Sequence, residues 1–335
     1  MSKILLITDA WEPQINGVVT TLVNLVKQLE KNNYDVKVIS PRDCKLTFPI
    51  PGYKEIKVGF MSTKRAKTIV LSEDWDYVHI GTPEGPLGTA FSKACNKLQK
   101  TFTASCHTKF PEFINARVPF IPIKLGWLWM KYKYKHASRI LTTTESMVKE
   151  LKYRGFKQPI KPWSRGVDRN IFTPDINKRP KGKPLDLVCV SRVSQEKGLD
   201  DFCKLNIHNA NLTVVGDGPY RKELEKKYPN VKFVGKKTGK TLAKYYQNAD
   251  VFVFPSKADT FGVVIIEALA SGTPVAAYPV TGPNDIIEQN INGYLDTDLN
   301  VAVTECLKLD RKTVYDSSTK WTWENCCQDF TDFLK

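Results

Sequence analysis

The sequence has no long apolar run and few of the side chains that bind metal ions. Only four histidines occur, and none of the eight cysteines belongs to a CxxC pair, so we expect no metal site and a reduced, cytoplasmic protein. The first residues, MSKILLITDAW, lead straight into a strand-like pattern without the apolar stretch of a signal peptide. We therefore expect neither secretion by a signal peptide nor a membrane span.

The length of 335 residues is enough for two domains, each with its own core. Hydrophobic residues make up 41% of the chain and charged residues 25%, as in soluble globular proteins. Proline, glycine and charged residues gather between the two halves and predict a linker over residues 169–184. The expected domains are residues 1–168 and 185–319, and residues 320–335 form an amphipathic helix rich in aromatic side chains.

Positive charge is concentrated in the first half of the chain. Residues 1–168 contain 27 Lys and Arg against 14 Asp and Glu, whereas residues 169–335 contain 23 against 21. This excess favours an anionic partner for the first half, such as a membrane surface, a phosphorylated acceptor or a nucleic acid. The alternative is a lysine-rich surface that has no such partner.

Short apolar strands alternate with helical segments in both halves, which indicates an α/β fold with two doubly wound parallel sheets. Ligands of such sheets bind beyond the carboxyl ends of the strands. The first helix is expected to follow the first strand directly, with Asn16 as its cap. The strands are expected at residues 3–8, 34–40, 76–80, 102–106, 139–143, 186–190, 212–216, 231–235, 251–255 and 274–278.

One carboxylate lies in an otherwise apolar helical segment near the end of the second half. Glu267 stands between VVII and ALA, where an unpaired buried charge would cost several kcal/mol. Asp259 precedes the same helix, whose first backbone N–H groups can bind an anion. These features predict a site for a polyol that bears phosphates, and a salt bridge of Glu267 within the core is the alternative. The residues around the helix start are Thr260, Phe261 and Gly262.

The segment SRVSQEKG follows the first strand of the second half. Arg192 and Lys197 are therefore expected at the carboxyl edge of the sheet. Two cations in this place suit a diphosphate, because Arg can bind phosphate with two parallel hydrogen bonds and Lys adds a point charge.

Four further features lie at or near the ends of expected strands. Gly17 opens the first helix, where glycine lets the backbone approach an anion. His107 ends a strand of the first half. Glu84 is interpreted first as the cap of a helix that begins near Pro86, and orientation of the acceptor is the alternative. The glycines of VVGDGPYRKELE, residues 214–225, are interpreted as those of a tight turn without a ligand.

Two pairs of aspartates look like metal-binding motifs and are interpreted otherwise. Asp74 and Asp76 precede a strand, on the side of the sheet away from the expected ligand, and favour a solvated turn. Asp296 and Asp298 favour a helix cap.

Residues 123–139, IKLGWLWMKYKYKHASR, interleave aromatic side chains with lysines. Such a segment can stack on nucleic acid or lie on a membrane surface. No nucleic-acid-binding module accompanies it, so we expect no nucleic acid and favour a helix with Trp127, Met130 or Tyr134 buried and a modest membrane role. The residues expected to face an anionic surface are Lys131, Lys133 and Lys135 beside Trp127 and Trp129.

Several of these motifs together resemble the family-four retaining glycosyltransferases, in particular the GDP-mannose-dependent α-mannosyltransferases and the sulfoquinovosyltransferases. The resemblance extends over nearly the whole chain and keeps the family's order of motifs. The family's first carboxylate is most often Glu, whereas this chain has the shorter Asp259. The motifs are TDAWEPQINGVVTTL at residues 8–22, SRVSQEKG at 191–198, VVGDGPYRKELE at 214–225, FVGKKTGKTLAKYYQNAD at 233–250, and Asp259 with Glu267.

The resemblance implies the GT-B fold, in which two Rossmann-like domains face a cleft and a C-terminal helix crosses back to the N-terminal domain. It assigns the acceptor, a glycan or a lipid-linked molecule, to the N-terminal domain and the nucleotide-sugar donor to the C-terminal domain. The implied reaction transfers a hexose with retention of configuration and without a metal or other cofactor. Mannose from GDP-mannose is expected first, UDP-sugars stay open, and an epimerase or a nucleotide-sugar-binding module of the same fold is the alternative.

The resemblance also implies roles for individual residues. Arg192 and Lys197 would bind the diphosphate of the donor and stabilise it as it leaves. Glu267 would hold the ribose hydroxyls, and Asp259 and His107 would contact the transferred sugar. The donor would also meet Gly17, Val234, Gly235, Thr260, Phe261 and Gly262.

Overall fold

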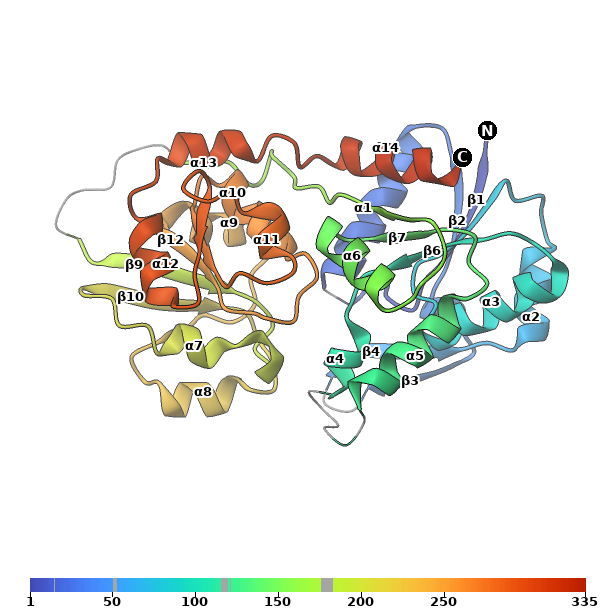
Figure 1. Cartoon of the computed structure of the whole chain (residues 1–335), viewed down its shortest axis with the longest axis horizontal. Coiled ribbons are helices and arrows are strands. Elements are labelled where there is room, and N and C mark those ends of the chain that lie inside the picture. Colours follow the sequence, from blue (N-terminus) through green and yellow to red (C-terminus); the bar gives the residue numbers. More distant parts are fainter. Residues whose placement is uncertain (15, 51–52, 116–119, 121, 176–182) are drawn as a thin grey trace. The chain divides into compact units, whose positions relative to one another are not determined.

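The structure, a computed structural model, describes the chain except for residues 15, 51–52, 116–119, 121 and 176–182. It divides into two compact units, each a sheet covered by helices on both faces (Figure 1). Unit 1 comprises Met1–Arg165 together with Trp323–Lys335, and unit 2 comprises Gly166–Thr322. Part of the predicted linker, residues 176–182, lies outside the described residues.

Unit 1 is built on a six-stranded sheet in the order β2-β1-β5-β6-β7-β8, with every neighbouring pair parallel. The interior strand β1 is buried on both faces, which is why its sequence is apolar without alternation. The strands are β1 (Lys3–Ile7), β2 (Asp35–Ile39), β5 (Tyr77–Ile80), β6 (Thr103–Cys106), β7 (Ile140–Thr142) and β8 (Ile160–Pro162).

The helices of unit 1 follow its strands, as the alternation predicted. Asn16 caps α1, because its side chain accepts a hydrogen bond from the backbone N–H of Val19, so the predicted cap is confirmed. An antiparallel hairpin of β3 (Leu46–Ile50) and β4 (Tyr53–Phe60) stands apart from the parallel sheet and was not predicted. The helices are α1 (Gly17–Lys31), α2 (Thr63–Val70), α3 (Pro86–Leu98), α4 (Phe110–Asn115), α5 (Ile123–Tyr134), α6 (Glu145–Tyr153) and α14 (Trp323–Leu334).

The C-terminal helix α14 packs on unit 1, beside α1, as predicted. Its Phe330 is fully buried and lies against the rings of His79 and Trp163. The Trp163 ring N–H donates to the carbonyl oxygen of Cys326 at 2.9 Å, and an Arg139 N–H donates to the carbonyl oxygen of Phe333 at 3.0 Å. The last helix in the sequence therefore belongs to the core of the first unit.

Unit 2 repeats the plan with the strand order β11-β10-β9-β12-β13-β14, again with all pairs parallel. This is the order of a Rossmann-type doubly wound sheet. The strands are β9 (Leu185–Val190), β10 (Ala210–Val215), β11 (Lys232–Phe233), β12 (Val251–Phe254), β13 (Val275–Ala277) and β14 (Gly293–Leu295). The helices are α7 (Leu199–Cys203), α8 (Arg221–Lys227), α9 (Gly239–Asn248), α10 (Val263–Ala270), α11 (Pro283–Ile286), α12 (Leu299–Cys306) and α13 (Arg311–Ser317).

Replacing Phe330 by Ala is expected to lower the free energy of unfolding of unit 1 by about 3–5 kcal/mol, because it leaves a large cavity between α14 and the sheet. Urea unfolding followed by tryptophan fluorescence measures the loss. Asp332→Ala, an exposed position on the same helix, is the control and should change stability by less than about 0.5 kcal/mol. Equal stability of the two variants would contradict the packing of α14 described above.

Candidate active site

The strand order of unit 2 creates one place where neighbouring loops diverge. The chain moves outward from β9 through β10 to β11 and then returns to the other side of β9 with β12. The loops after β9 and β12 therefore leave the carboxyl edge in opposite directions, and ligands of doubly wound sheets bind at such a point. The two loops are residues 191–198 and 255–262, which contain most of the predicted site residues.

Lys197 and Asp259 connect these two loops. The Lys197 Nζ lies 2.6 Å from a carboxylate oxygen of Asp259, and each side chain is about three-quarters buried. Gly198 makes this approach possible, since it adopts the left-handed conformation (φ 65°) and a Cβ there would lie 2.6 Å from the carbonyl oxygen of Pro255. The structure thus brings together two residues that are 62 positions apart in the sequence.

Asp259 stays ionised in this position. Burial by itself would raise the pKa of its carboxyl, but the charge of Lys197, hydrogen bonds from Lys197 and Ser256, and the charge of Arg192 outweigh burial and lower the pKa. Arg192 is half-buried and near enough for its charge to act on Asp259. Arg192, Lys197 and Asp259 therefore form one charged cluster with a surplus of one positive charge.

Glu267 lies on α10, with a half-buried side chain that accepts a hydrogen bond from the Tyr246 hydroxyl at 3.0 Å. Burial raises the pKa of its carboxyl to about 7. In the part of the chain that the structure describes, Glu267 forms no ion pair, so the alternative of a salt bridge within the core is wrong there. Among the described residues one neutral donor, the Tyr246 hydroxyl, holds this carboxyl. The partial loss of water around the carboxyl costs free energy, and a ligand that forms hydrogen bonds with it would reduce that cost.

The loop before α10 is shaped by glycines. Gly262 precedes the helix in the left-handed conformation (φ 91°), and among the described side chains none caps α10. Thr260 and Phe261 are buried, and Gly282 (φ 93°) lies close to their backbone, since a Cβ there would be 2.9 Å from the Phe261 carbonyl oxygen. The loop is therefore held in place by backbone packing beside the charged cluster.

Val234 and Gly235 follow β11, and both take part in backbone hydrogen bonds of the sheet. The N–H of Val234 donates to the Val214 carbonyl, and the Gly235 carbonyl accepts from the N–H of Gly216. The turn after β10 needs glycine at position 216, because a Cβ there would lie 1.8 Å from the Ser191 carbonyl oxygen. The steric need for glycine at this turn is confirmed, whereas the absence of a ligand there stays a prediction.

His107 belongs to unit 1, where it is buried in a hydrogen-bonded network. Its Nδ1 lies 3.1 Å from an N–H group of Arg165, which can only donate, so Nδ1 accepts and Nε2 carries the hydrogen. Nε2 then donates to the hydroxyl of Ser105 at 2.8 Å. Burial, followed by the charges of Arg165 and His79, holds the pKa of His107 well below its usual value, so the ring is neutral.

The predicted cap of α3 is wrong. Glu84 does not cap this helix, because its carboxylate accepts a hydrogen bond from the Tyr134 hydroxyl at 2.8 Å. The cap comes from Asp9, directly after β1, which accepts from the backbone N–H groups of Leu87 at 3.0 Å and Gly88 at 3.2 Å. Burial raises the pKa of Asp9 to about 6 and that of Glu84 to about 7. Asp9 was not predicted as this cap, and the only sequence signal for it is its position directly after a buried strand.

The remaining predicted residues are placed as follows. Gly17 is the first residue of α1, in unit 1. Asp76 is exposed and accepts a hydrogen bond from the backbone N–H of Lys3 at the amino end of β1, and Asp298 caps α12, so both interpretations are confirmed. The described residues include no group of three or more His, Cys, Asp or Glu side chains that could hold a metal ion, and metal independence stays a prediction.

Two doubly wound parallel units, with a cluster of charged side chains at the carboxyl edge of the second, give the chain the plan of the GT-B fold. Two family descriptions match it, "Glycosyltransferase Family 4" over residues 15–170 and "Glycosyl transferases group 1" over residues 172–302. The chain belongs to glycosyltransferase family 4 and uses a nucleotide-sugar as donor.

Known proteins are similar to the chain along most of its length. A GDP-mannose-dependent alpha-mannosyltransferase from Corynebacterium glutamicum is 30% identical over 317 residues, which cover 88% of this chain and 76% of the relative. An alpha-monoglucosyldiacylglycerol synthase from Streptococcus pneumoniae is 24% identical over a match that covers 91% of this chain and 78% of the relative. Sucrose-phosphate synthase from Thermosynechococcus elongatus has the same fold, with a TM-score of 0.78 at 17% identity, over 99% of this chain and 98% of that one.

The raised pKa of Glu267 predicts that this carboxyl makes the protein less stable as the pH rises. Between the ordinary pKa of about 4.5 and the folded value of about 7, the folded state binds the proton more tightly than the unfolded state, so the free energy of unfolding falls with rising pH. Glu267→Gln should remove this part of the pH dependence. Urea unfolding of both proteins at a series of pH values measures it, and an unchanged slope in the variant would contradict the raised pKa of this carboxyl.

Proposed function

We propose that the chain is a retaining hexosyltransferase that transfers mannose from GDP-mannose to a lipid or lipid-linked acceptor, without a metal. The observation that carries the donor half of this proposal is the cluster of Arg192, Lys197 and Asp259 at the switch point of unit 2. The 30% identical relative from C. glutamicum, which is a GDP-mannose-dependent enzyme, supports the choice of donor. A UDP-sugar is the alternative, because backbone groups near Val234 and Gly235 would read the base.

In this proposal each side of the donor meets a different group. Glu267 accepts hydrogen bonds from the ribose hydroxyls, which replace solvent around a carboxyl whose one hydrogen-bond partner among the described residues is the Tyr246 hydroxyl. Arg192 and Lys197 bind the diphosphate, helped by the backbone from Thr260 to Gly262. Asp259, ionised beside Lys197, accepts from a hydroxyl of the sugar. Gly17 and the neutral His107, both in unit 1, keep in this proposal the roles that the family resemblance implies for them.

The proposed chemistry is a displacement on one face of the sugar. The bond between C1 and the phosphate oxygen breaks as the bond between C1 and the acceptor oxygen forms. The departing phosphate oxygen takes the proton of the acceptor hydroxyl, so no separate base is required. Negative charge grows on the diphosphate during this step, and the cations that stabilise it there contribute more to the transition state than to the ground state.

Replacement of Arg192 or Lys197 by Ala is expected to lower kcat for transfer from GDP-mannose by about 10²-fold or more, because each change removes a charge aimed at the leaving group. Release of GDP in the presence of a lipid acceptor measures turnover. Lys204→Ala, an exposed position of unit 2, is the control and should keep the wild-type rate. Wild-type kcat in both cluster variants would refute the diphosphate assignment.

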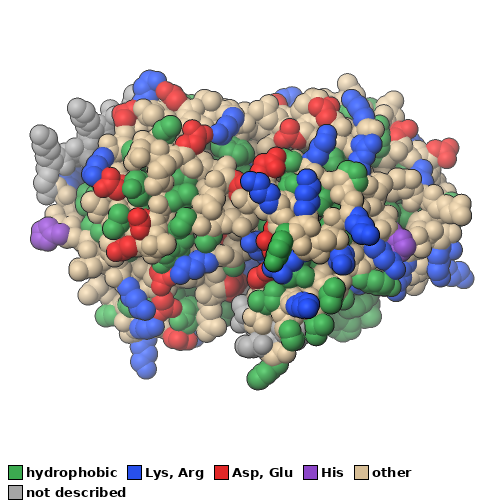
Figure 2. All heavy atoms as spheres, viewed as in Figure 1, with side chains coloured by type: hydrophobic (Ala, Val, Ile, Leu, Met, Phe, Trp, Pro, Cys, Tyr) green, Lys and Arg blue, Asp and Glu red, His purple; other side chains and the backbone are tan. Residues whose placement is uncertain are grey.

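The acceptor half of the proposal rests on α5. Its inward side buries Trp127, Met130 and Tyr134, while large apolar side chains also cover its outward side. Hydrophobic side chains and lysines mix on the face of unit 1 where α5 and the β3–β4 hairpin lie (Figure 2). The outward apolar residues of α5 are Ile123, Leu125, Leu128, Trp129 and Tyr132, and its lysines, with the one that follows it, are Lys124, Lys131, Lys133 and Lys135.

This combination suits the surface of an anionic membrane, where lysines attract headgroups and aromatic rings settle at the interface. No described helix is both long and apolar enough to cross a membrane. Contact with the surface would therefore be peripheral. The relative from S. pneumoniae, an alpha-monoglucosyldiacylglycerol synthase, makes a lipid product and supports a lipid acceptor.

We expect reversible, salt-sensitive binding to phosphatidylglycerol-containing vesicles in a sedimentation assay. Lys124→Gln with Lys135→Gln should weaken it by about 1 kcal/mol for each lysine, since each charge lies near the surface and is screened by salt. The matched control is Lys222→Gln with Lys226→Gln, two exposed lysines of unit 2. A lack of binding at low salt would favour a soluble glycan acceptor instead.

A further inference from the structure

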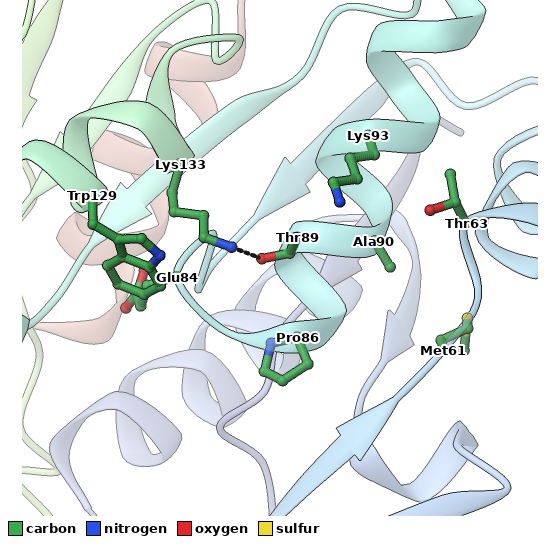
Figure 3. Close-up of a pocket in the computed structure, with 9 residues that line it drawn as sticks. All are labelled: Met61, Thr63, Glu84, Pro86, Thr89, Ala90, Lys93, Trp129 and Lys133. Carbon is green, nitrogen blue, oxygen red and sulfur yellow. Dashed lines mark hydrogen bonds between the residues drawn. The ribbon is translucent and has the colours of Figure 1, made fainter.

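A pocket of about 390 Å³ opens between α3, α5 and the end of β4, entirely within unit 1. Its size lies in the range of small-molecule sites. Figure 3 shows Lys93 on α3 and Lys133 on α5 with their side chains directed toward the same space, which Trp129 borders on one side. The other lining residues are Met61, Thr63, Glu84, Pro86, Thr89 and Ala90.

The two lysines bring positive charge into the pocket without a matching carboxylate. Neither Lys93 nor Lys133 forms an ion pair with any residue that the structure describes. Lys133 Nζ donates instead to the Thr89 hydroxyl at 2.7 Å and lies 5.1 Å from the centre of the Trp129 ring. Burial, and then the charge of Lys93, lowers the pKa of Lys133, as expected for two ammonium groups held near each other.

The acids nearby have other partners. Glu84 accepts from the Tyr134 hydroxyl, and its pKa of about 7 leaves it partly protonated at neutral pH. Asp9 accepts hydrogen bonds from the start of α3. The pocket therefore keeps a net positive charge, which an anion with several acceptor oxygens would neutralise while it accepts from both ammonium groups.

The apolar lining of the pocket favours an anion that carries a carbon skeleton over an inorganic ion. Trp129, Met61, Ala90 and Pro86 are apolar, so they suit a short carbon skeleton next to the anionic group. Trp129 also belongs to the outward apolar side of α5, with 37% of its surface exposed. A group bound in the pocket thus lies beside the surface on which the apolar part of a lipid would rest.

We propose that this pocket binds the phosphate of a phospholipid headgroup, which makes the acceptor, or the lipid that presents it, a phosphate-bearing molecule. The inference rests on the lipid acceptor of the proposed function. It places the phosphate between Lys93 and Lys133, with the Thr63 and Thr89 hydroxyls at the rim and the glycerol part of the headgroup against Trp129.

Isothermal titration with sn-glycerol 3-phosphate and with inorganic phosphate tests the pocket apart from any membrane. We expect both probes to bind, and Lys93→Gln to weaken binding about tenfold, the loss of one charge-assisted contact. Lys93→Glu, a charge reversal at the same exposed position, should abolish it. Lys97→Ala, one turn further along α3 and outside the pocket, is the matched control and should bind as the wild type does. Equal affinity in wild type and Lys93→Glu, or no binding of either probe, would overturn the proposal.

Vesicles distinguish a lipid headgroup from a free phosphate ester. At low salt, where vesicle binding is expected, Lys93→Glu should weaken binding to phosphatidylglycerol vesicles more than Lys97→Glu, the same charge reversal on an exposed lysine outside the pocket. If glycerol phosphate binds but Lys93→Glu leaves vesicle binding unchanged, the claim that the bound phosphate belongs to a lipid headgroup would be overturned. The affinity for GDP should be the same in all variants, because Lys93 belongs to unit 1 and the proposed nucleotide site lies in unit 2. A failure of the donor proposal would therefore appear in the GDP titration and not in the phosphate titration.

Discussion

Parallel strand pairing decides where every functional group of this chain can lie. In both six-stranded sheets each βα loop leaves from the same edge, and the order of the strands makes two of those loops diverge at one point. In unit 2 these loops follow β9 and β12, and they carry Lys197 and Asp259 to a separation of 2.6 Å. In unit 1 the corresponding loops follow β1 and β5 and contain Asp9 and Glu84. Chemistry can thus change in the loops while the sheets stay the same.

The protein stabilises its buried ionisable side chains in different ways. Asp259 is paired with a lysine and stays ionised, whereas Glu267 accepts a hydrogen bond from a hydroxyl and its pKa rises to about 7. His107 is kept neutral beside Arg165. Asp259 and His107 are therefore each held in a defined protonation state before a ligand arrives, which reduces the reorganisation that binding and reaction require. The free energy for this arrangement comes from the apolar cores of the two units.

Local patterns predicted much of the structure. The ten expected strands and the Asn16 and Asp298 caps depend on apolar runs and capping residues that can be seen in the sequence, whereas the return of the C-terminal helix to unit 1 was expected from the family resemblance. Long-range contacts could not be predicted in this way. Asp9 replaces Glu84 as the cap of α3 because the end of β1 lies beside the start of that helix. The pocket between Lys93 and Lys133 depends likewise on how α3 and α5 pack.

The central claim is that unit 2 holds the nucleotide of the donor through Glu267 and the charged cluster. Isothermal titration of GDP, UDP and ADP against the wild type and Glu267→Gln tests it most directly. The account predicts that GDP binds most tightly and that the variant loses about 1–3 kcal/mol of GDP affinity, the value of a charge-assisted hydrogen bond. Absence of nucleotide binding, or equal GDP affinity in the two proteins, would contradict it.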